Sequence, residues 1–272
     1  MEKKMIVKHE YPILEYNTEK TAVINPDRNA SKADRDGEGG GGFRRFPRLC
    51  LVTFFEEVLD SAVERYGGEK IGTYVSEMKD FHAYRFTVEG TEVCAVQAVV
   101  ASGSIAMMTD WLYGQGVEAI VCCGCCGVLD DIPEGAVIIP VRALRDEGAS
   151  YKYLPPARFI ELQQGPIERF REVLSGHGIP YIECATWSTD GFYRETREMV
   201  AYRKEEGCRA VEMECATMAA IAQFRGKVFG QLLYSGDILI GGAEDYDDRG
   251  WNNNVSARER LFALALEALC KL

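Results

Sequence analysis

The chain has 272 residues, of which 47% are hydrophobic and 27% charged, and its formal net charge at pH 7 is −11. A chain of this length and composition can bury a core large enough to fold without disulfides or metal ions, and we expect one domain over residues 1–272. The acidic balance excludes general binding to nucleic acids or to anionic membranes, because both depend on basic patches. A small anionic substrate stays open, since a local pocket can oppose the global charge.

The N-terminal residues carry no export or membrane signal. Residues 1–8 are charged and lack an apolar core, and the longest uncharged apolar stretch, Ala119–Leu129, is shorter than the ~20 residues of a spanning helix. Four of the ten cysteines fall within residues 122–126, too close together to link distant elements. We therefore expect reduced thiols and a cytoplasmic location.

One segment, residues 27–45, departs from the composition of the rest. It is rich in glycine and charge and almost free of large apolar residues. This composition predicts a flexible surface insert. A glycine-rich phosphate-binding loop does not fit, because the glycines are consecutive and lead into no Lys-Ser or Lys-Thr pair.

Beyond this insert, apolar segments of strand length alternate with segments of helical periodicity. The apolar segments predict strands at residues 93–100, 118–123, 136–141, 181–186 and 228–234. Helical spacing predicts helices from Ser104, as N-cap, to Gly114 or Gly116, and at residues 166–176, 196–206, 214–224 and 258–272. This alternation is typical of an α/β fold around a largely buried sheet.

Familiar catalytic signatures are scarce. The three histidines, His9, His82 and His177, have no metal-binding spacing, and neither a G-x-S-x-G turn nor a glycine-rich dinucleotide fingerprint occurs. The sequence therefore does not favour a hydrolase triad, a zinc enzyme or an NAD enzyme, and we expect no metal and no cofactor.

The segment CCGCC at residues 122–126 is the most conspicuous local feature. Its overlapping C-x-x-C spacings could hold a soft metal or exchange disulfides, but there is no second pair to complete four ligands. The segment also continues an apolar run in which cysteine acts as a small hydrophobe. The favoured interpretation is a strand entering a tight glycine turn, where Gly124 and Gly127 let a ligand approach the backbone.

Two acidic clusters are candidates for a sugar and base site. Glu212 and Glu214 flank Met213 at the start of an alanine-rich helix, where the helix dipole alone would favour either carboxylate. A carboxylate there can also accept two hydrogen bonds from a vicinal diol such as that of ribose. Asp237 directly follows an apolar strand, and it is either a turn residue beside Gly236 or a carboxylate at the ligand-binding edge of the sheet.

Together these segments resemble the nucleoside phosphorylase family, which includes purine nucleoside phosphorylase, uridine phosphorylase and related nucleosidases. The matching motifs run in one order between Gly103 and Leu239: GSIAMMTDWLYGQGVEAIVCCGCCGVL, GAVIIPVRALRDEGASYKYLPP, STDGFYRET, VEMECATMAAIAQF and YSGDIL. The resemblance implies a single-domain, phosphorylase/hydrolase-like three-layer α/β fold with a central mixed sheet flanked by helices. It also implies a homo-oligomer, from dimer to hexamer.

On the sugar side, the resemblance assigns Glu214 to the carboxylate that binds the ribose 2′ and 3′ hydroxyls. Met213 matches the residue that packs against the sugar, and Glu212 lies at a neighbouring acidic position that lines the site. In the family, a histidine near the N-terminus of one subunit completes the ribose site of a neighbouring subunit. His9 is the candidate for that role.

On the base side, Phe192 matches the aromatic residue that stacks on the base, and Gly127 follows the turn that faces base and phosphate. Asp237 matches the aspartate that protonates N7 of a leaving purine. Arg249 is near the position of an arginine that assists this aspartate. Uridine phosphorylases recognise uracil with a Gln-x-Arg pair, which is missing here. Only Arg197 lies near the position of the arginine of that pair.

The phosphate side departs most from the family. Cys122 stands where phosphorylases carry an arginine, Cys125 replaces a phosphate-binding Thr or Ser next to Gly124, and the N-terminal phosphate loop is reduced to a segment around Arg28. Cysteine offers no charge comparable to the guanidinium fork. Other basic residues could rebuild the anion site, from this chain or a neighbour: Arg28, Arg44, Arg45 or Arg48.

The resemblance implies cleavage of an N-glycosidic bond through an oxocarbenium-like sugar. With phosphate as nucleophile and co-substrate the products are free base and ribose 1-phosphate, from a purine nucleoside or uridine. Water as nucleophile would make the protein a nucleosidase, which the lost phosphate ligands favour. A catalytically silent nucleoside-binding protein is the third alternative. We expect phosphorolysis, as in nucleoside salvage.

Overall fold

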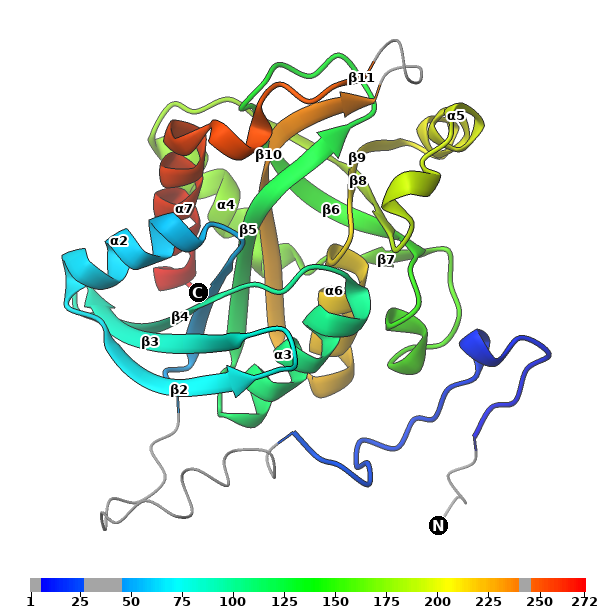
Figure 1. The fold of residues 1–272 in the computed structure, drawn as a ribbon, viewed down its shortest axis with the longest axis horizontal. Helices are drawn as coiled ribbons and strands as arrows, with labels where there is room; N and C mark the ends of the chain where they lie inside the picture. Colours follow the sequence, from blue (N-terminus) through cyan, green and yellow to red (C-terminus); the bar gives the residue numbers. More distant parts are fainter. Residues whose placement is uncertain (1–5, 27–45, 240–245) are drawn as a thin grey trace.

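The computed structural model describes residues 6–26, 46–239 and 246–272 (Figure 1). The predicted insert at 27–45, with Arg28, Arg44 and Arg45, lies outside the described residues. The described strands form one eleven-stranded mixed sheet. They are β1 (Leu49–Thr53), β2 (Glu69–Val75), β3 (Asp80–Val88), β4 (Thr91–Gln97), β5 (Ala119–Val128), β6 (Val137–Asp146), β7 (Phe159–Glu161), β8 (Tyr181–Thr189), β9 (Cys208–Glu212), β10 (Val228–Leu239) and β11 (Tyr246–Asp247).

Part of this sheet closes on itself. β10 pairs with β6, β6 with β8, β8 with β9, β9 with β5, and β5 again with β10, so that five strands form a ring. From β5 the sheet continues through β1 and β4 to the antiparallel strands β3 and β2. Because β1, β4, β5 and β10 run parallel, their carboxyl ends meet at one edge, where ligands bind in open α/β sheets.

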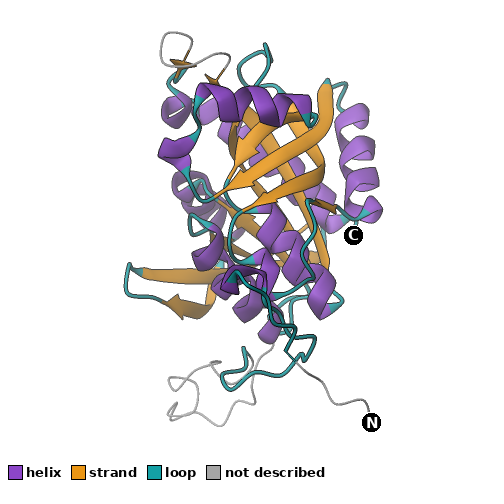
Figure 2. Ribbon diagram, turned by 90° about the vertical axis from the view of Figure 1, so that its right-hand side faces the viewer, coloured by secondary structure: helices purple, strands orange, loops and turns teal. Residues whose placement is uncertain are grey.

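Helices cover the sheet on both sides (Figure 2). One group is α2 (Glu56–Tyr66), α4 (Gln164–Gly176) and α7 (Val255–Cys270); the second is α3 (Ser102–Gly114) and α6 (Cys215–Arg225). In the first group, α7 contacts β1, β5 and β10, α4 contacts β10 and β6, and α2 contacts β3 and β4. In the second, α6 packs against β6, β8 and β10, and α3 packs on α6. α5 (Arg197–Glu205) packs beside β9. The expected α/β architecture with helices on both sides of a mixed sheet is confirmed.

The main core lies between the sheet and these helices. The apolar residues that the helical spacing assigned to one face, Ile105, Met108 and Leu112, are fully buried, and Leu261 and Leu269 of α7 are equally buried. Each predicted strand and helix is present, with ends shifted by a few residues. The spacing did not predict β1, α2, β2, β3, β7, β9 or β11.

Two local predictions are wrong. The CCGCC segment does not enter a glycine turn, because β5 continues through it to Val128 and pairs with β9 at Gly127. Ser104 is not an N-cap, because α3 begins at Ser102 and its N-cap is Ala101, which has no side-chain oxygen. Both errors fall at the edge of the sheet where the candidate site lies.

The N-terminal segment lies beside the main body (Figure 1). A short 3-10 helix, η1 (Pro12–Leu14), packs near η2 (Ser150–Lys152), and Lys152 Nζ donates to the carbonyls of Pro12 and Ile13 at 2.8 and 3.1 Å. Two further 3-10 turns are η3 (Phe192–Arg194) and η4 (Trp251–Asn253). Within the described ranges, no helix is long and apolar enough to pass through a membrane.

Candidate active site

Glu212 and Glu214 occupy one turn between β9 and α6, and they have different tasks. Both carboxylate oxygens of Glu212 are used inside the protein: Oε2 accepts the backbone N–H groups of Glu214 and Cys215 at 2.8 and 2.6 Å, and Oε1 accepts the Ser188 hydroxyl at 2.5 Å and that of Thr186 at 3.3 Å. Glu212 therefore satisfies N–H groups that the first turn of a helix leaves free. It fixes the start of α6 and, with it, the backbone of Glu214.

Glu214 is the N-cap residue of α6 and is 5% exposed. Its Oε1 accepts the backbone N–H of Ala101 at 2.6 Å, and its Oε2 accepts the N–H of Met213 at 3.3 Å. Burial, followed by the nearby charge of Glu212, raises the pKa of Glu214 to about 8. Met213 itself is half-buried on the same turn.

The partner of Glu214, Ala101, has a strained backbone. Its φ of 76° and ψ of 151° lie in a region that is otherwise populated by glycine. Such a conformation costs of order 1–3 kcal/mol and persists when the surroundings enforce it. The strain lets the Ala101 N–H point at the carboxylate while α3 begins at the next residue. The sequence carried no signal for this role, because alanine is not a residue that favours positive φ.

Asp237 lies in β10, across from the end of β5. A Cβ added to Gly127 would lie 3.3 Å from Asp237 Oδ1, so the glycine leaves the space that this carboxylate needs. Burial raises the pKa of Asp237, while its own backbone N–H and the charge of Arg249 oppose the rise. The Arg249 guanidinium also donates to the carbonyl of Ile132 at 2.8 Å, which holds it on this side of the molecule.

Glu195 is a second half-buried carboxyl near Asp237 that sequence reasoning missed. It follows η3, and burial, with the charge of Asp237, raises its pKa to about 7. Tyr246 lies close enough to both groups for their charges to raise the pKa of its phenol, after burial. An acidic residue in the motif GFYRET was the available signal, but the charged helix that follows made a surface role the simpler interpretation.

The Cys125 thiol is close enough to both Glu214 and Asp237 to respond to their charges. Burial raises the pKa of its thiol to about 11, and the charges of Asp237 and Glu214 both contribute in the same direction. Both carboxylates are therefore close enough to act on one neutral thiol near the carboxyl end of β5. This is the proximity that a shared sugar and base site requires.

The β5 residues assigned to phosphate offer no charge. Cys122 is fully buried, and burial raises the pKa of its thiol well above the ordinary value. A Cβ on Gly124 would lie 2.7 Å from the ring of Phe54, so this glycine is needed for packing against that ring. All ten cysteines are free, and nine of the chain's thiols have raised pKa values with burial as the first cause.

Asp190 joins two loops at the edge of the site. Its Oδ1 accepts the Ser102 hydroxyl at 2.6 Å and its Oδ2 accepts the Gly148 N–H at 2.8 Å. The loop before α3 is thereby tied to the loops that follow β6 and β8. This tie holds Ala101 against Glu214, and it was not predicted because Asp190 precedes a glycine and looks like an ordinary turn residue.

Several predicted site residues are exposed or lie outside the described residues. Phe192 is 51% exposed, and its ring contacts that of Tyr193 at 5.1 Å between centroids. Arg197 is exposed at the first position of α5. His9 is exposed, and its Nδ1 accepts the Tyr11 N–H at 3.0 Å within the N-terminal segment. Arg28 lies outside the described residues.

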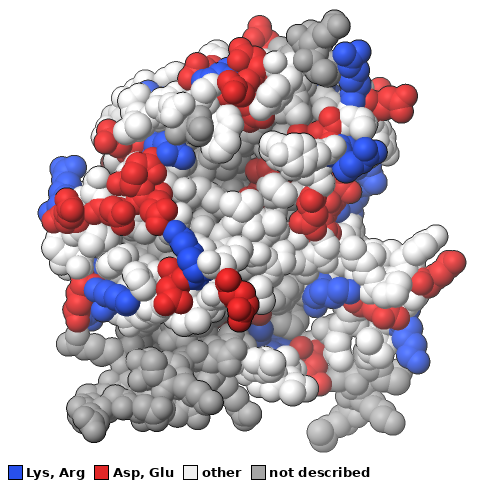
Figure 3. Space-filling view, viewed as in Figure 1, with Lys and Arg blue, Asp and Glu red and all other residues white. Residues whose placement is uncertain are grey.

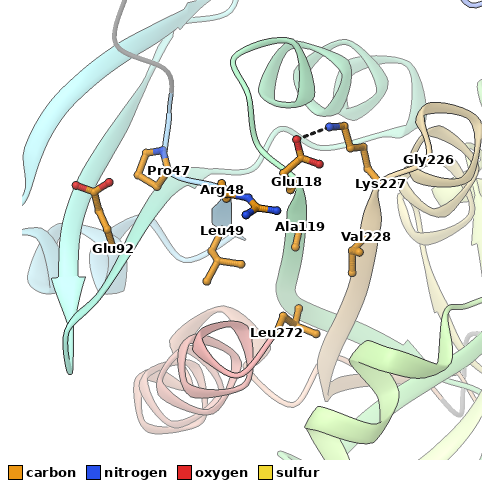
Figure 4. A pocket seen from close by; sticks show the side chains of 10 residues that line it. All are labelled: Pro47, Arg48, Leu49, Glu92, Glu118, Ala119, Gly226, Lys227, Val228 and Leu272. Carbon is orange, nitrogen blue, oxygen red and sulfur yellow. Dashed lines mark ion pairs between the residues drawn. The ribbon is translucent and has the colours of Figure 1, made fainter.

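A hollow of about 600 Å³ lies at the opposite end of the sheet (Figure 4). It is formed by the amino ends of β1, β5 and β10, and the ion pair between Lys227 and Glu118, 2.7 Å long, lies on its rim. Arg48 lines this hollow, so within one chain it is remote from Glu214 and Asp237. The suggestion that Arg48 rebuilds the anion site is therefore wrong for a site formed by a single subunit.

The comparisons with known proteins agree with this geometry. Guanosine phosphorylase of Halorubrum lacusprofundi is 26% identical over 209 residues, which cover 73% of this chain and 84% of that protein. The structure of uridine phosphorylase from Vibrio fischeri superposes with a TM-score of 0.70 at 19% identity over 84% of this chain and 93% of that one. AMP nucleosidase from Bacteroides thetaiotaomicron gives a TM-score of 0.65 at 23% identity over 82% and 88% of the two chains.

The strongest of these findings concerns the family. A model of the phosphorylase superfamily matches residues 48–270, which include every described strand and the cluster around Glu214 and Asp237. The resemblance seen in the motifs VEMEC and YSGDIL is thereby confirmed. This chain belongs to the phosphorylase superfamily.

Proposed function

We propose that this protein cleaves the N-glycosidic bond of a nucleoside by phosphorolysis, giving a free base and ribose 1-phosphate. The observation that carries the proposal is that two carboxyl groups, the buried Glu214 and the half-buried Asp237, are both close enough for their charges to act on one thiol, Cys125. Membership of the superfamily and the similarity to guanosine phosphorylase support the reaction class.

Glu214 binds the sugar in this proposal. A carboxylate accepts hydrogen bonds at both oxygens, and the two hydroxyls of a ribose diol supply two donors at matching spacing. Each oxygen of Glu214 already holds one backbone N–H, so the diol would meet a carboxylate whose orientation is fixed in advance. In its ionised form, this fixed group next to the sugar also favours the positive charge of an oxocarbenium-like transition state.

Asp237 acts as the general acid. A leaving purine needs a proton, and an aspartic acid can deliver one near neutral pH only if its pKa lies above the ordinary value. Burial raises the pKa of Asp237, and the opposing charge of Arg249 keeps the group able to lose its proton again. General acid catalysis of this kind contributes typically ~10²–10⁴-fold to the rate.

A purine is the base that these residues favour. Two carboxyl groups, those of Asp237 and Glu195, lie together at this end of the site, and the charge of the first raises the pKa of the second. Carboxyl groups can accept from ring and exocyclic N–H donors, of which a guanine base offers three on one edge. The similarity to the uridine phosphorylase structure concerns the fold. The residue pair that recognises uracil in uridine phosphorylases has no match in this sequence.

The decisive experiment compares base release with and without inorganic phosphate. Guanosine, inosine, adenosine and uridine would be incubated with the protein in phosphate-free buffer and after addition of phosphate. Release that requires phosphate, together with ribose 1-phosphate as product, is the expected result. Equal release in both buffers would identify a nucleosidase, and binding of nucleosides without release would identify a silent binding protein.

Hydrolysis remains the second candidate because of one observation, the fully buried and uncharged Cys122 where the resemblance places an arginine. We further propose that the protein is a homo-oligomer in which His9 completes the ribose site of a neighbour. The exposed position of His9 on the N-terminal segment suits a contact outside its own chain.

A further inference from the structure

We propose that Arg258, on α7, is the phosphate-binding residue of this protein, and that Glu57 holds its guanidinium in place until phosphate displaces the carboxylate. The inference rests on the proposed function and adds to it the cation that the β5 segment lacks. Neither the motifs nor the comparisons point to either residue.

Arg258 projects from the first turns of α7 toward the carboxyl end of β1. Its side chain is 14% exposed, and its guanidinium carbon lies 5.0 Å from the centroid of the buried Phe55 ring. A guanidinium packed over an aromatic face is partly desolvated and therefore interacts strongly with an anion. The Phe55 ring is in turn 5.9 Å from the Tyr234 ring, between centroids.

This chain of contacts leads into the candidate site. Tyr234 is the direct register partner of Cys125 on the neighbouring strand, so both side chains leave the sheet on the same side. In agreement with this placement, the charge of Arg258 lowers the pKa values of the Tyr234 phenol and the Cys125 thiol, against the larger effect of burial. Cys125 thus has Glu214, Asp237 and Arg258 around it.

The guanidinium has donors to spare. Its one ion-pair partner among the described residues is Glu57, to which Nη1 donates, and its Nε is buried without a hydrogen-bond partner in the same part of the structure. A buried donor without a partner costs about 1–3 kcal/mol. Phosphate offers several acceptor oxygens with a spacing that matches the guanidinium fork.

Glu57 explains how such a cation can exist before phosphate binds. It lies in the first turn of α2, whose outer face carries exposed acidic side chains (Figure 3): Glu56, Glu57, Asp60 and Glu64. The Glu57 side chain is 46% exposed, so release into water costs it little. Phosphate would then take its place on the guanidinium, and Glu57 would compete with phosphate for the site.

The test uses the full-length enzyme and the KM for inorganic phosphate. In Arg258→Gln this KM should rise roughly 10- to 100-fold, because hydrogen bonds to a charged group are lost. The KM for the nucleoside at saturating phosphate should change little. Glu57→Gln should act in the opposite direction and lower the phosphate KM a few-fold, which no folding defect would produce. Arg169→Gln, which removes an equal charge from a surface pair with Glu172 on α4, is the matched control.

The outcomes separate this inference from the proposed function. Phosphate-dependent cleavage with an unchanged phosphate KM in both Arg258→Gln and Glu57→Gln would overturn the role of Arg258 and leave phosphorolysis intact. If the wild-type enzyme cleaves nucleosides equally without phosphate, the proposed function fails. Calorimetry with inorganic phosphate then decides about Arg258 alone: binding that Arg258→Gln abolishes supports the anion site, and equal or absent binding in both proteins overturns it.

Discussion

The backbone N–H of Glu214 donates to the carboxylate of Glu212 at 2.8 Å, so the first acidic residue of VEMEC fixes the second. Glu212 keeps both oxygens inside the protein, whereas Glu214 reaches across to Ala101 at the start of α3. The two glutamates therefore have different roles. Glu212 accepts the free N–H groups at the start of α6, and Glu214 is oriented to bind a ligand. This division makes different demands on substitutions at the two positions.

The Glu212 side chain should tolerate an amide far better than a truncation. Glu212→Ala leaves two backbone N–H groups and the Ser188 hydroxyl without an acceptor, and should lower the free energy of unfolding by about 2–4 kcal/mol. Glu212→Gln keeps an acceptor for the N–H groups and can donate to the hydroxyls, so its cost should stay below about 1 kcal/mol. Chemical denaturation of both variants measures the difference. Equal destabilisation would show that charge, and not hydrogen bonding, is what Glu212 contributes.

Glu214→Ala should change the preference between sugars. Its carboxylate is assigned to the ribose diol, so the loss in kcat/KM should be larger for guanosine than for 2′-deoxyguanosine, by roughly tenfold or more. The deoxy substrate lacks one of the two hydroxyls, so the substitution removes fewer hydrogen bonds to it and lowers its kcat/KM less. Parallel kinetics on the two substrates give the ratio directly. If both sugars lose activity by the same factor, Glu214 does not bind the diol.

The stability of the protein should fall as the pH rises from about 5 to about 8. Burial raises the pKa of Glu214 to about 8 and that of Glu195 to about 7, both above the ordinary value of an unfolded glutamate. In this window the folded state therefore holds more protons than the unfolded state, and stability is lost as the pH increases through the folded pKa values. Glu214→Gln should flatten this dependence, and the exposed Glu259→Gln should not. Melting temperatures at several pH values test the sign; a wild-type profile that rises over this window contradicts it.

Sequence patterns predicted the parts of the fold that depend on periodicity. Apolar runs identified β5 and β10, and helical spacing identified α4 and α7, because burial of one continuous face determines these elements. β9, by contrast, was missed because it is short and its last residue, Glu212, is charged. Its buried carboxylate is stable only through hydrogen bonds from β8 and α6, which no local pattern contains.

The sequence predicted the main carboxylates of the candidate site but not the residues that surround them. Glu214 and Asp237 belong to recognisable sequence motifs. Ala101 contributes through its strained backbone, and Glu195 through a pKa that burial raises. Neither property can be read from the residue type. Arg258 is separated from Cys125 by more than a hundred residues and reaches it through the pairing of β10 with β5. Such long-range contacts follow from the closed part of the sheet, which periodicity does not encode.

Gly127→Ala should damage both packing and catalysis. The added Cβ would lie 2.8 Å from the Leu239 side chain, 2.9 Å from that of Val211 and 3.3 Å from Asp237 Oδ1. We expect a loss of about 1–3 kcal/mol in stability and a reduced kcat, because the acid must move. Gly165→Ala on α4 is the matched control: it meets no atom within 4 Å and should stabilise by up to about 1 kcal/mol. A Gly127→Ala enzyme with normal kcat would show that Asp237 does not need its present position.

Asp237→Asn should separate binding from chemistry. The amide has nearly the same shape and can still hydrogen-bond the base, so nucleoside affinity should be retained, but it cannot deliver a proton to the leaving purine. Turnover with guanosine or inosine should therefore fall by at least ~10²-fold. The alkaline limb of the pH–rate profile, where the raised pKa of Asp237 controls loss of the catalytic proton, should disappear in the residual activity. Asp60→Asn, on the exposed face of α2, controls for the change of charge. Turnover within about threefold of wild type would remove Asp237 from the acid role, since a positioned acid contributes far more than that.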